Sequence, residues 1–294
     1  MSWRDRSCGI GDEAAPGITE QLAIHRELDL GAIELRTVDG IGLHRLTAAE
    51  LDRLAAEVGE SGLAVPVLDT PVGNWSTTVA TDLDAELAVL AGSAACAHAL
   101  GARWLRVMSY PNDGRPDQEW AAESLRRLAV LTREAERLDV GLLHENCQGW
   151  AGQGPAQTLR LLEYVDSPAL RLIFDVGNGL AYGYQAPEFL SAVLPWVEHV
   201  HIKDGHRTAD GEVFTLPGTG EIDIADCVRQ LEDFGYRGRY SLEPHVAHIP
   251  HLTATAGEAE LATGYRACAQ GFRTIWEQVG ERVGEQLPQA VRHG

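Results

Sequence analysis

Basic residues are scarce in this 294-residue sequence. It contains 24 Lys and Arg against 43 Asp and Glu, which gives a formal net charge of −19 at pH 7. Proteins that bind nucleic acids neutralise phosphates with clustered lysine and arginine, and this chain lacks such clusters. The composition therefore argues against a nucleic-acid partner.

Cysteines are few, and none of them forms a close pair. The five residues stand at positions 8, 96, 147, 227 and 268, an odd number without the spacing of a zinc knuckle. We expect reduced, mostly structural thiols. This includes Cys147, although it stands close to Glu145, a candidate site residue.

Long apolar segments are also missing, since none could cross a bilayer without carrying charge. The nearest one, residues 83–100, contains Asp84, Glu86 and His98 and is typical of an amphipathic helix. Residues 1–11 lack the apolar stretch of a secretory signal. We therefore predict a cytoplasmic protein without a membrane partner.

Short β-rich runs alternate with longer helical patterns along the chain, as in parallel β/α units. Eight strands are predicted, at residues 7–11, 32–36, 63–68, 103–108, 140–145, 171–175, 199–203 and 239–243. No Gly-x-Gly-x-x-Gly fingerprint follows the first strand, which argues against a doubly wound dinucleotide-binding sheet. The prediction is an α/β protein with a single (β/α)8 TIM barrel over residues 1–280 and a C-terminal tail over 281–294.

The last four predicted strands end in residues that commonly bind metals. These are Glu145, Asp175, His201 and Glu243. Each could be structural on its own, for example as a packed histidine or a carboxylate that caps a loop. Because catalytic groups of such barrels lie at the C-terminal ends of the strands, the four together predict a site for one divalent cation.

The same segments resemble a known family. The motifs are HEN at 144–146, FDVGN at 174–178, HVHIKD at 199–204, PGTGEID at 217–223 and FGYRGRYSLEP at 234–244. They are similar to the xylose isomerase-like TIM barrels, in particular to the sugar phosphate isomerase/epimerase group of ketose 3-epimerases, hydroxypyruvate isomerase and inosose dehydratase. The resemblance implies that the four strand-end residues bind one metal ion, Mn2+ or Mg2+, with Co2+ or Zn2+ as alternatives.

The resemblance also implies two substrate contacts. The family's epimerases use a histidine three residues after the metal aspartate and an arginine six residues after the metal histidine. The arginine is present as Arg207, but Asn178 occupies the histidine position. This departure leaves open how the substrate is held.

A cation held by three carboxylates and one imidazole keeps positions where a carbonyl and an adjacent hydroxyl of a keto-sugar can bind, which acidifies the carbon between them. Glu145 and Glu243 are then candidates to remove and return the proton. Return on the opposite face gives an epimerase, and return to the neighbouring carbon gives an isomerase acting through a metal-stabilised enediolate. Loss of a leaving group gives a lyase or dehydratase, and we keep that alternative for a keto-inositol or a 3-keto-glycoside.

Further substrate-binding candidates are His144, Lys203 and Trp75. His144 should point to the opposite face of its strand from Glu145, which also allows a packing role. Lys203 shares the face of His201, and Trp75 could stack on a sugar. Glu34 can either reach the pocket or pair near Arg36.

The loop after Glu243 contains His245, His248 and His251, whose spacing fits no standard closed metal site. The loop from Gly205 to Asp223 can be either a lid over the substrate or an ordinary exposed hairpin.

Two other classes of function remain as alternatives. A metal-dependent abasic-site nuclease of the same superfamily needs more ligands and a basic groove, and a non-catalytic sugar-binding barrel would have a broken ligand set. The few lysines and arginines near the strand ends favour a free sugar over a phosphorylated one. A homo-oligomer or an accessory subunit stays open.

Overall fold

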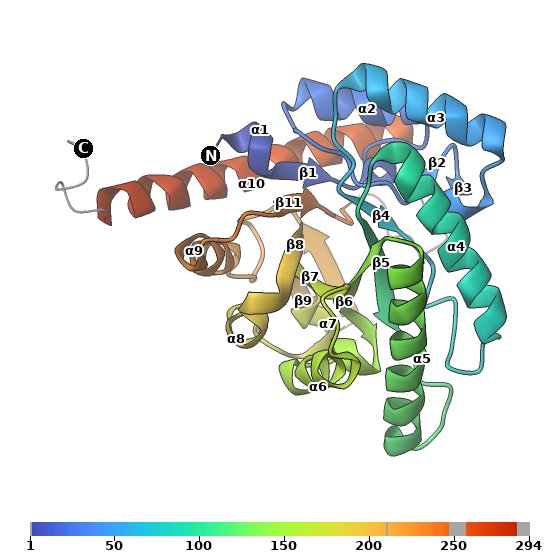
Figure 1. Cartoon of the computed structure of the whole chain (residues 1–294). Helices are drawn as coiled ribbons and strands as arrows, with labels where there is room; N and C mark the ends of the chain where they lie inside the picture. The colour runs from blue at the N-terminus through green and yellow to red at the C-terminus, as the bar shows by residue number, and fades with distance from the viewer. Residues whose placement is uncertain (1, 210, 247–256, 287–294) are drawn as a thin grey trace, which may run out of the picture.

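The computed structural model, which describes residues 2–209, 211–246 and 257–286, has the predicted barrel architecture (Figure 1). Seven strands form one curled parallel sheet in the order β1-β11-β8-β7-β6-β5-β4. Their bounds are β1 Ser7–Gly9, β4 Val67–Asp69, β5 Trp104–Ser109, β6 Gly141–Gly149, β7 Leu170–Asp175, β8 Val197–Ile202 and β11 Arg239–Leu242.

The predicted strand at residues 32–36 is not a regular strand, but its segment fills the eighth position. Isolated parallel bridges join Glu34 to Ile10 on one side and Leu35 to Leu68 on the other. The amide of Glu34 donates to the carbonyl of Gly9 at 2.8 Å, which closes the barrel between β1 and β4. Both neighbouring strands are three residues long, so only single pairs form here.

Helices surround the sheet as an outer layer (Figure 1). They are α2 Ile18–Glu27, α3 Ala48–Ser61, α4 Leu83–Leu100, α5 Asp117–Arg137, α6 Pro155–Val165, α8 Ala186–Val193, α9 Ile224–Phe234 and α10 Glu258–Gln286. The last helix continues beyond residue 280, where the tail is predicted to begin. Residues 287–294 lie outside the described part, so the domain division stays a prediction.

Several short elements lie outside the predicted pattern. They are α1 Trp3–Arg6, α7 Gly179–Tyr182, the 3-10 turns Gly11–Glu13, Leu43–Arg45, Trp150–Gly152 and Leu194–Trp196, and two antiparallel hairpins. One hairpin joins β2 Thr37–Val38 to β3 Ile41–Gly42, and the other joins β9 Asp204–Thr208 to β10 Gly211–Thr215. The second hairpin occupies the segment in which a lid or an exposed hairpin is expected.

By length and composition alone, α4 is apolar enough to cross a membrane, with a mean hydropathy of 1.3 over its 18 residues. In the barrel it lies between α3 and α5 (Figure 1). It buries Leu90, Ala94 and Ala97 along one face. This packing is that of a barrel helix.

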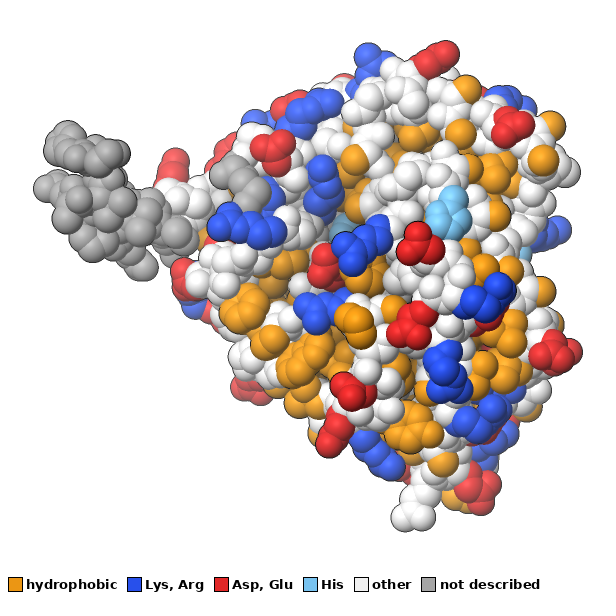
Figure 2. Space-filling model, viewed as in Figure 1, with side chains coloured by type: hydrophobic (Ala, Val, Ile, Leu, Met, Phe, Trp, Pro, Cys, Tyr) orange, Lys and Arg blue, Asp and Glu red, His pale blue; other side chains and the backbone are white. Residues whose placement is uncertain are grey.

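The strands carry an apolar layer below their polar ends. Val67, Trp104, Leu143 and Ile173, one from each of four adjacent strands, form a small buried cluster. Since side chains alternate along a strand, Leu143 shares the face of Glu145 two residues further on. Figure 2 shows acidic and basic side chains interspersed on one outer face of the molecule.

His25 on α2 is a buried histidine that is held neutral. Its Nδ1 lies 2.8 Å from the carbonyl of Gln21, and its Nε2 lies 3.0 Å from both the carbonyl of Gly9 and the hydroxyl of Tyr265 on α10. Burial lowers the pKa of His25 to about 4, although contacts with the carbonyls of Gln21 and Gly9 oppose this shift. The imidazole therefore gains a proton only when the chain unfolds or the solution becomes strongly acidic.

This depressed pKa predicts acid sensitivity. Above a pH of about 6.5, His25 is neutral in both the folded and the unfolded chain. As the pH falls towards 4, only the unfolded chain takes up a proton at His25. The free energy of unfolding should then fall by about 1.4 kcal/mol per pH unit on account of this residue. The free energy of unfolding would be measured by urea denaturation at pH 7.5 and at pH 5. Its decrease between these two pH values should be about 2 kcal/mol smaller for His25→Gln than for the parent. Equal differences would contradict a neutral His25.

Candidate metal centre and active site

The four predicted metal ligands meet at one end of the barrel. Glu145 lies in β6, Asp175 ends β7, His201 lies in β8 and Glu243 directly follows β11. All four are buried, and one ligand atom of each lies within 4.8 Å of those of the others. The parallel strands thus bring together residues that are up to a hundred positions apart in the sequence.

The distances suit a single hexacoordinate cation. Nδ1 of His201 lies 3.2 Å from Oε2 of Glu243, 3.8 Å from Oε1 of Glu145 and 3.9 Å from Oδ2 of Asp175. Ligands bound to Mg2+ at about 2.1 Å lie about 3 Å apart when they occupy adjacent corners of an octahedron. The observed separations are of this size or slightly larger, so a small inward movement would bring the four ligand atoms to bonding distance and leave two corners open.

The cluster also has the charge that a cation would balance. Burial raises the pKa of Asp175 to about 7, with the nearby Lys203 opposing the shift and Glu243 and Glu145 adding to it. Nζ of Lys203 lies 3.0 Å from Oδ2 of Asp175 and 2.8 Å from Oε2 of Glu243. Neither oxygen, nor Nδ1 of His201, makes a well-formed hydrogen bond within the described residues. A divalent ion would coordinate these atoms directly and add to the positive charge that Lys203 already brings to the carboxylates.

The outer atoms of two ligands are held by fixed donors. Nη1 of Arg106 donates to Oε2 of Glu145 at 3.2 Å, which leaves Oε1 facing the centre. The backbone amides of Gly177 and Asn178 donate to Oδ1 of Asp175 at 2.7 and 2.9 Å, which leaves Oδ2 facing the centre. Such second contacts orient metal ligands and restrict their movement.

Glu243 is arranged in the same way. Its Oε1 lies 3.5 Å from Nη1 of Arg36 and 3.4 Å from Nε2 of His245, while its Oε2 faces the cluster. Burial acts to raise its pKa, but the charges of Lys203, His245 and His201 hold that pKa well below the usual range. Glu243 is therefore a carboxylate rather than a carboxylic acid.

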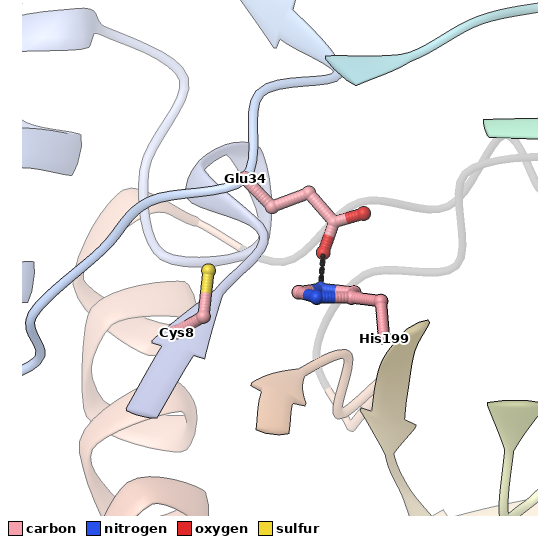
Figure 3. A group of neighbouring side chains, drawn as sticks. All are labelled: Cys8, Glu34 and His199. Carbon is pink, nitrogen blue, oxygen red and sulfur yellow. Dashed lines mark hydrogen bonds and ion pairs between the residues drawn. The ribbon is translucent and has the colours of Figure 1, made fainter. Parts of the chain in front are cut away.

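Glu34 orients the histidine ligand. Its carboxylate lies 3.1 Å from Nε2 of His201 and 3.0 Å from Nε2 of His199, and it accepts a hydrogen bond from the hydroxyl of Ser241 at 2.6 Å. Figure 3 shows Glu34 and His199 facing each other. Because Nε2 of His201 faces Glu34, Nδ1 is the ring nitrogen that faces the metal cluster. Burial acts to lower the pKa of His201, but the carboxylates of Glu34 and Glu243 raise it well above its usual value, so a bound cation would take the place of the proton on Nδ1. Glu34 thus lies behind the ligands, and neither role weighed for it from the sequence matches this position.

Replacing Glu34 should weaken metal binding. Glu34→Gln keeps the shape of the side chain but removes the negative charge that fixes the ring, so Mn2+ affinity should fall about 10- to 100-fold. Isothermal titration calorimetry would measure the affinity, and NMR of the His201 ring nitrogens would report the tautomer. Ser241→Ala, which removes one donor to Glu34 without touching His201, should have little effect. Unchanged Mn2+ affinity in Glu34→Gln would contradict the orienting role.

Cys8 lies beside Glu34 and His199 (Figure 3). Burial, and to a smaller degree the charge of Glu34, raises the pKa of Cys8 to about 12. The group is then a neutral thiol, whereas metals bind thiolates. All five cysteines are free in the structure, in agreement with the prediction of reduced thiols.

A cavity of about 440 Å³ opens over the metal cluster. Glu145, Glu243 and Lys203 face it from the strand ends, and Phe214 and Glu212 line it from β10. This size lies in the usual range for small-molecule sites. The β9–β10 hairpin therefore forms part of the wall above the cluster.

Three of the predicted substrate contacts line this cavity. They are Asn178, Lys203 and Trp75. The Nδ2 group of Asn178 donates to Oε1 of Glu145 at 3.2 Å, next to the position where a substrate would lie. Cys147 also lines the cavity, with its thiol pKa raised by burial.

Two other predicted contacts lie elsewhere. The guanidinium of Arg207 donates to the backbone carbonyls of Gly179 and Leu180 in α7 and lines a neighbouring cavity. His144 is fully buried, and neither ring nitrogen has a hydrogen-bond partner within the described residues. Burial lowers its pKa to about 4. The structure thus gives Arg207 a role in tying the hairpin to α7 and gives His144 a packed position.

His245 lies at the edge of the cavity, with its Nε2 3.2 Å from Oε1 of Glu13. His248 and His251 lie outside the described residues.

Some residues of the site were not expected from the sequence. Arg106, Arg36, Phe214 and Glu212 belong to this group. The two arginines left a signal, since a charged residue inside a buried strand requires a partner. Phe214 and Glu212 gave no such signal in the sequence, because the position of the hairpin over the barrel decides which of the hairpin's side chains face the cavity.

Comparison with known proteins identifies the family. The model of the xylose isomerase-like TIM barrel family matches residues 22–268, and the chain belongs to that family. This confirms the resemblance inferred from the strand-end motifs.

Individual proteins of known name share a third or less of their residues with this chain over the matched regions. An inosose dehydratase of Klebsiella pneumoniae is 33% identical over 149 residues, which cover 43% of this chain and 48% of that protein. The match thus spans about half the length of the relative. An L-ribulose 3-epimerase structure superimposes with a TM-score of 0.73 and 18% identity over 97% of this chain and 99% of the other. The structure of a xylose isomerase-like TIM barrel protein of Mycobacterium smegmatis, in complex with magnesium, superimposes with a TM-score of 0.69 and 18% identity. The match covers 96% of this chain and 99% of the other.

Proposed function

We propose that this protein is a divalent-metal-dependent isomerase or epimerase that removes a proton from the carbon next to the carbonyl of a keto-sugar or related polyol. The observation that carries the proposal is the placement of Glu145 and Glu243. Both carboxylates line one cavity, and each has an outer oxygen held by a buried arginine and an inner oxygen facing the cluster.

The chain's own residues account for the proton transfer. Glu145 and Glu243 approach the cavity from β6 and β11, so one can take the proton and the other can return it. When bound, a cation would draw electron density from the carbonyl oxygen and acidify the neighbouring carbon. The Asn178 amide and the Lys203 ammonium offer hydrogen bonds to oxygens that gain negative charge.

A dehydratase or other lyase is the second candidate. One relative, matched over about half of its length, is an inosose dehydratase, which supports a reaction on a keto-inositol. Lys203 and His245 lie 3.4 Å apart beside Glu243, where a departing hydroxyl could be protonated. Such a reaction shares the first proton removal with the isomerase and differs in the second step, where a hydroxyl leaves.

Deuterium exchange would test the proposal. Protein loaded with Mn2+ or Mg2+, in D2O, should incorporate deuterium at the carbon next to the carbonyl of at least one ketose, inosose or 3-keto-glycoside, as read by NMR. A product of unchanged mass apart from deuterium supports the isomerase, and loss of water supports the dehydratase. Absence of exchange across the panel with confirmed metal occupancy would overturn the proposal.

Three finer points belong to the same proposal. Mn2+ or Mg2+ is the native ion, since oxygen ligands dominate the shell. The substrate is a small sugar, and the reaction takes place in the cytoplasm. Metal analysis of the protein purified from its source and its fractionation between compartments would test the first and last points.

A further inference from the structure

Lys203 is the only lysine among the 24 lysine and arginine residues of the chain. It directly follows β8, two residues after His201, and it is 2% exposed. An added Cβ at Gly177 would overlap Cγ of Lys203, so this glycine leaves room for the lysine stem. The ammonium group contacts the metal cluster and also lines the cavity above it. The single lysine therefore lies at the boundary between the cluster and the cavity.

The ammonium contacts the oxygens that face the centre of the cluster. Nζ lies 3.0 Å from Oδ2 of Asp175 and 2.8 Å from Oε2 of Glu243. The outer oxygens of the carboxylate ligands are held instead by backbone amides or by the guanidinium groups of Arg36 and Arg106. A bound cation would use the inner oxygens. Lys203 and the cation would thus bind to the same two atoms.

A lysine suits this position better than an arginine. An ammonium is a compact point charge, whereas a guanidinium is a planar fork that pairs best with one carboxylate. The compact group can approach carboxylates from two strands, as a small metal ion does. Within the described residues neither Oδ2 of Asp175 nor Oε2 of Glu243 makes a well-formed hydrogen bond. The contacts of Lys203 are therefore mainly ionic, and a cation of higher charge can replace them.

Other groups on the cavity side lie close to the ammonium. Nζ lies 3.5 Å from Oδ1 of Asn178 and 5.8 Å from the centre of the Phe214 ring. It also lies 3.4 Å from Nδ1 of His245, which can accept in one of its tautomers. Amide oxygens and aromatic faces both stabilise an ammonium. The head group can therefore leave the two carboxylates and still have partners.

From these contacts we infer that Lys203 competes with the divalent cation for the inner oxygens of Asp175 and Glu243, and that the ammonium moves into the cavity when the cation is bound. The inference rests on the proposed function in taking the cluster as the metal centre. Its consequence is that Lys203 is free to contact substrate oxygens only in the metal-loaded protein. Metal binding and substrate binding are then coupled through this one side chain.

Calorimetric Mn2+ affinities at one fixed pH would test the competition. Lys203→Met removes the competing charge, so Mn2+ should bind about 5- to 150-fold more tightly than in the parent, the usual range of coupling between two ligands. Arg106→Met is the matched comparison, because Arg106 is buried to the same extent but contacts an outer oxygen of Glu145. It should weaken Mn2+ binding, since Glu145 loses an orienting donor.

A second lysine variant guards against a folding defect. Lys203→Gln is neutral but keeps a donor for the two oxygens, so it should also bind Mn2+ more tightly than the parent. Unchanged or weaker Mn2+ binding in both lysine variants would overturn the inference. Tighter binding in Arg106→Met as well would also overturn it, because a general effect of charge would then explain the result.

NMR would follow the ammonium directly, because the chain contains a single lysine. In protein that carries isotope-labelled lysine, the ammonium signal should shift on saturation with Mg2+. Its protons should exchange with water faster, since they leave two buried acceptors. A signal that stays in place at full Mg2+ occupancy would overturn the inference. Failure of the parent and every variant to bind Mn2+ would remove the metal centre and with it the proposed function, whereas equal and measurable affinities would overturn the inference alone.

Discussion

Replacing Glu145 or Glu243 with glutamine should lower the rate of deuterium exchange about 10²- to 10⁴-fold, the range attributed to a positioned general base. Glutamine keeps the size of each side chain and can still accept from Arg106 or Arg36, but it cannot take a proton. Exchange would be measured by NMR in D2O at saturating Mn2+, with the bound metal quantified for every variant.

The two variants should differ from each other if the enzyme is an epimerase. Each carboxylate would serve one face of the carbon, so Glu145→Gln and Glu243→Gln should block exchange from opposite epimers. Glu86→Gln is a suitable control, because Glu86 is buried and paired with Arg127 at 2.7 Å but does not line the cavity over the metal cluster. If both site variants kept full exchange with every active substrate, the two-carboxylate mechanism would be wrong.

The sequence was sufficient to predict the barrel and the grouping of the metal cluster. Glu145, Asp175, His201 and Glu243 each follow an apolar run, and in a parallel barrel such positions share one edge. The family match confirms the fold, and the structure brings the four residues together. The assignment of roles to these residues stays a prediction that the glutamine variants would test.

The residues behind the ligands were harder to predict. Glu34 contacts His199, His201 and Ser241 across the barrel interior, and these contacts join β8 and β11 to the segment between β1 and β4. Alternation along a strand gives the face of a residue but not its partner across the barrel. The partner depends on the register and closure of the barrel, which a single sequence does not state.

The placement of Arg207 illustrates the same limit for loops. Its position six residues after His201 suggested a substrate contact, but the β9–β10 hairpin turns its guanidinium towards the carbonyls of α7. Phe214 and Glu212 from the other strand line the cavity instead. Arg207 and Glu212 are cross-strand partners and share one face of the hairpin, so the conformation of the long arginine side chain decides this, and the sequence does not state that conformation.

Removing Arg106 should produce the largest loss of stability. Arg106 is 1% exposed and lies between Asp69 and Glu145, with contacts of 3.2 Å to each. Arg106→Met fills most of the same space but leaves the buried Glu145 carboxylate without its counter-charge and Asp69 without its partner, so the free energy of unfolding should fall by about 3–5 kcal/mol. Chemical denaturation of the metal-free protein at pH 7 would measure the change.

The same substitution should also weaken Mn2+ binding about 10- to 100-fold, because the outer oxygen of Glu145 loses the donor that orients the carboxylate. Arg127→Met is the matched control, since Arg127 is buried and pairs with Glu86 in the helical layer. It should destabilise the fold and leave Mn2+ affinity unchanged, which separates loss of a buried ion pair from loss of ligand orientation. If Arg106→Met and Arg127→Met changed Mn2+ affinity alike, Arg106 would be a structural residue only and would not orient Glu145.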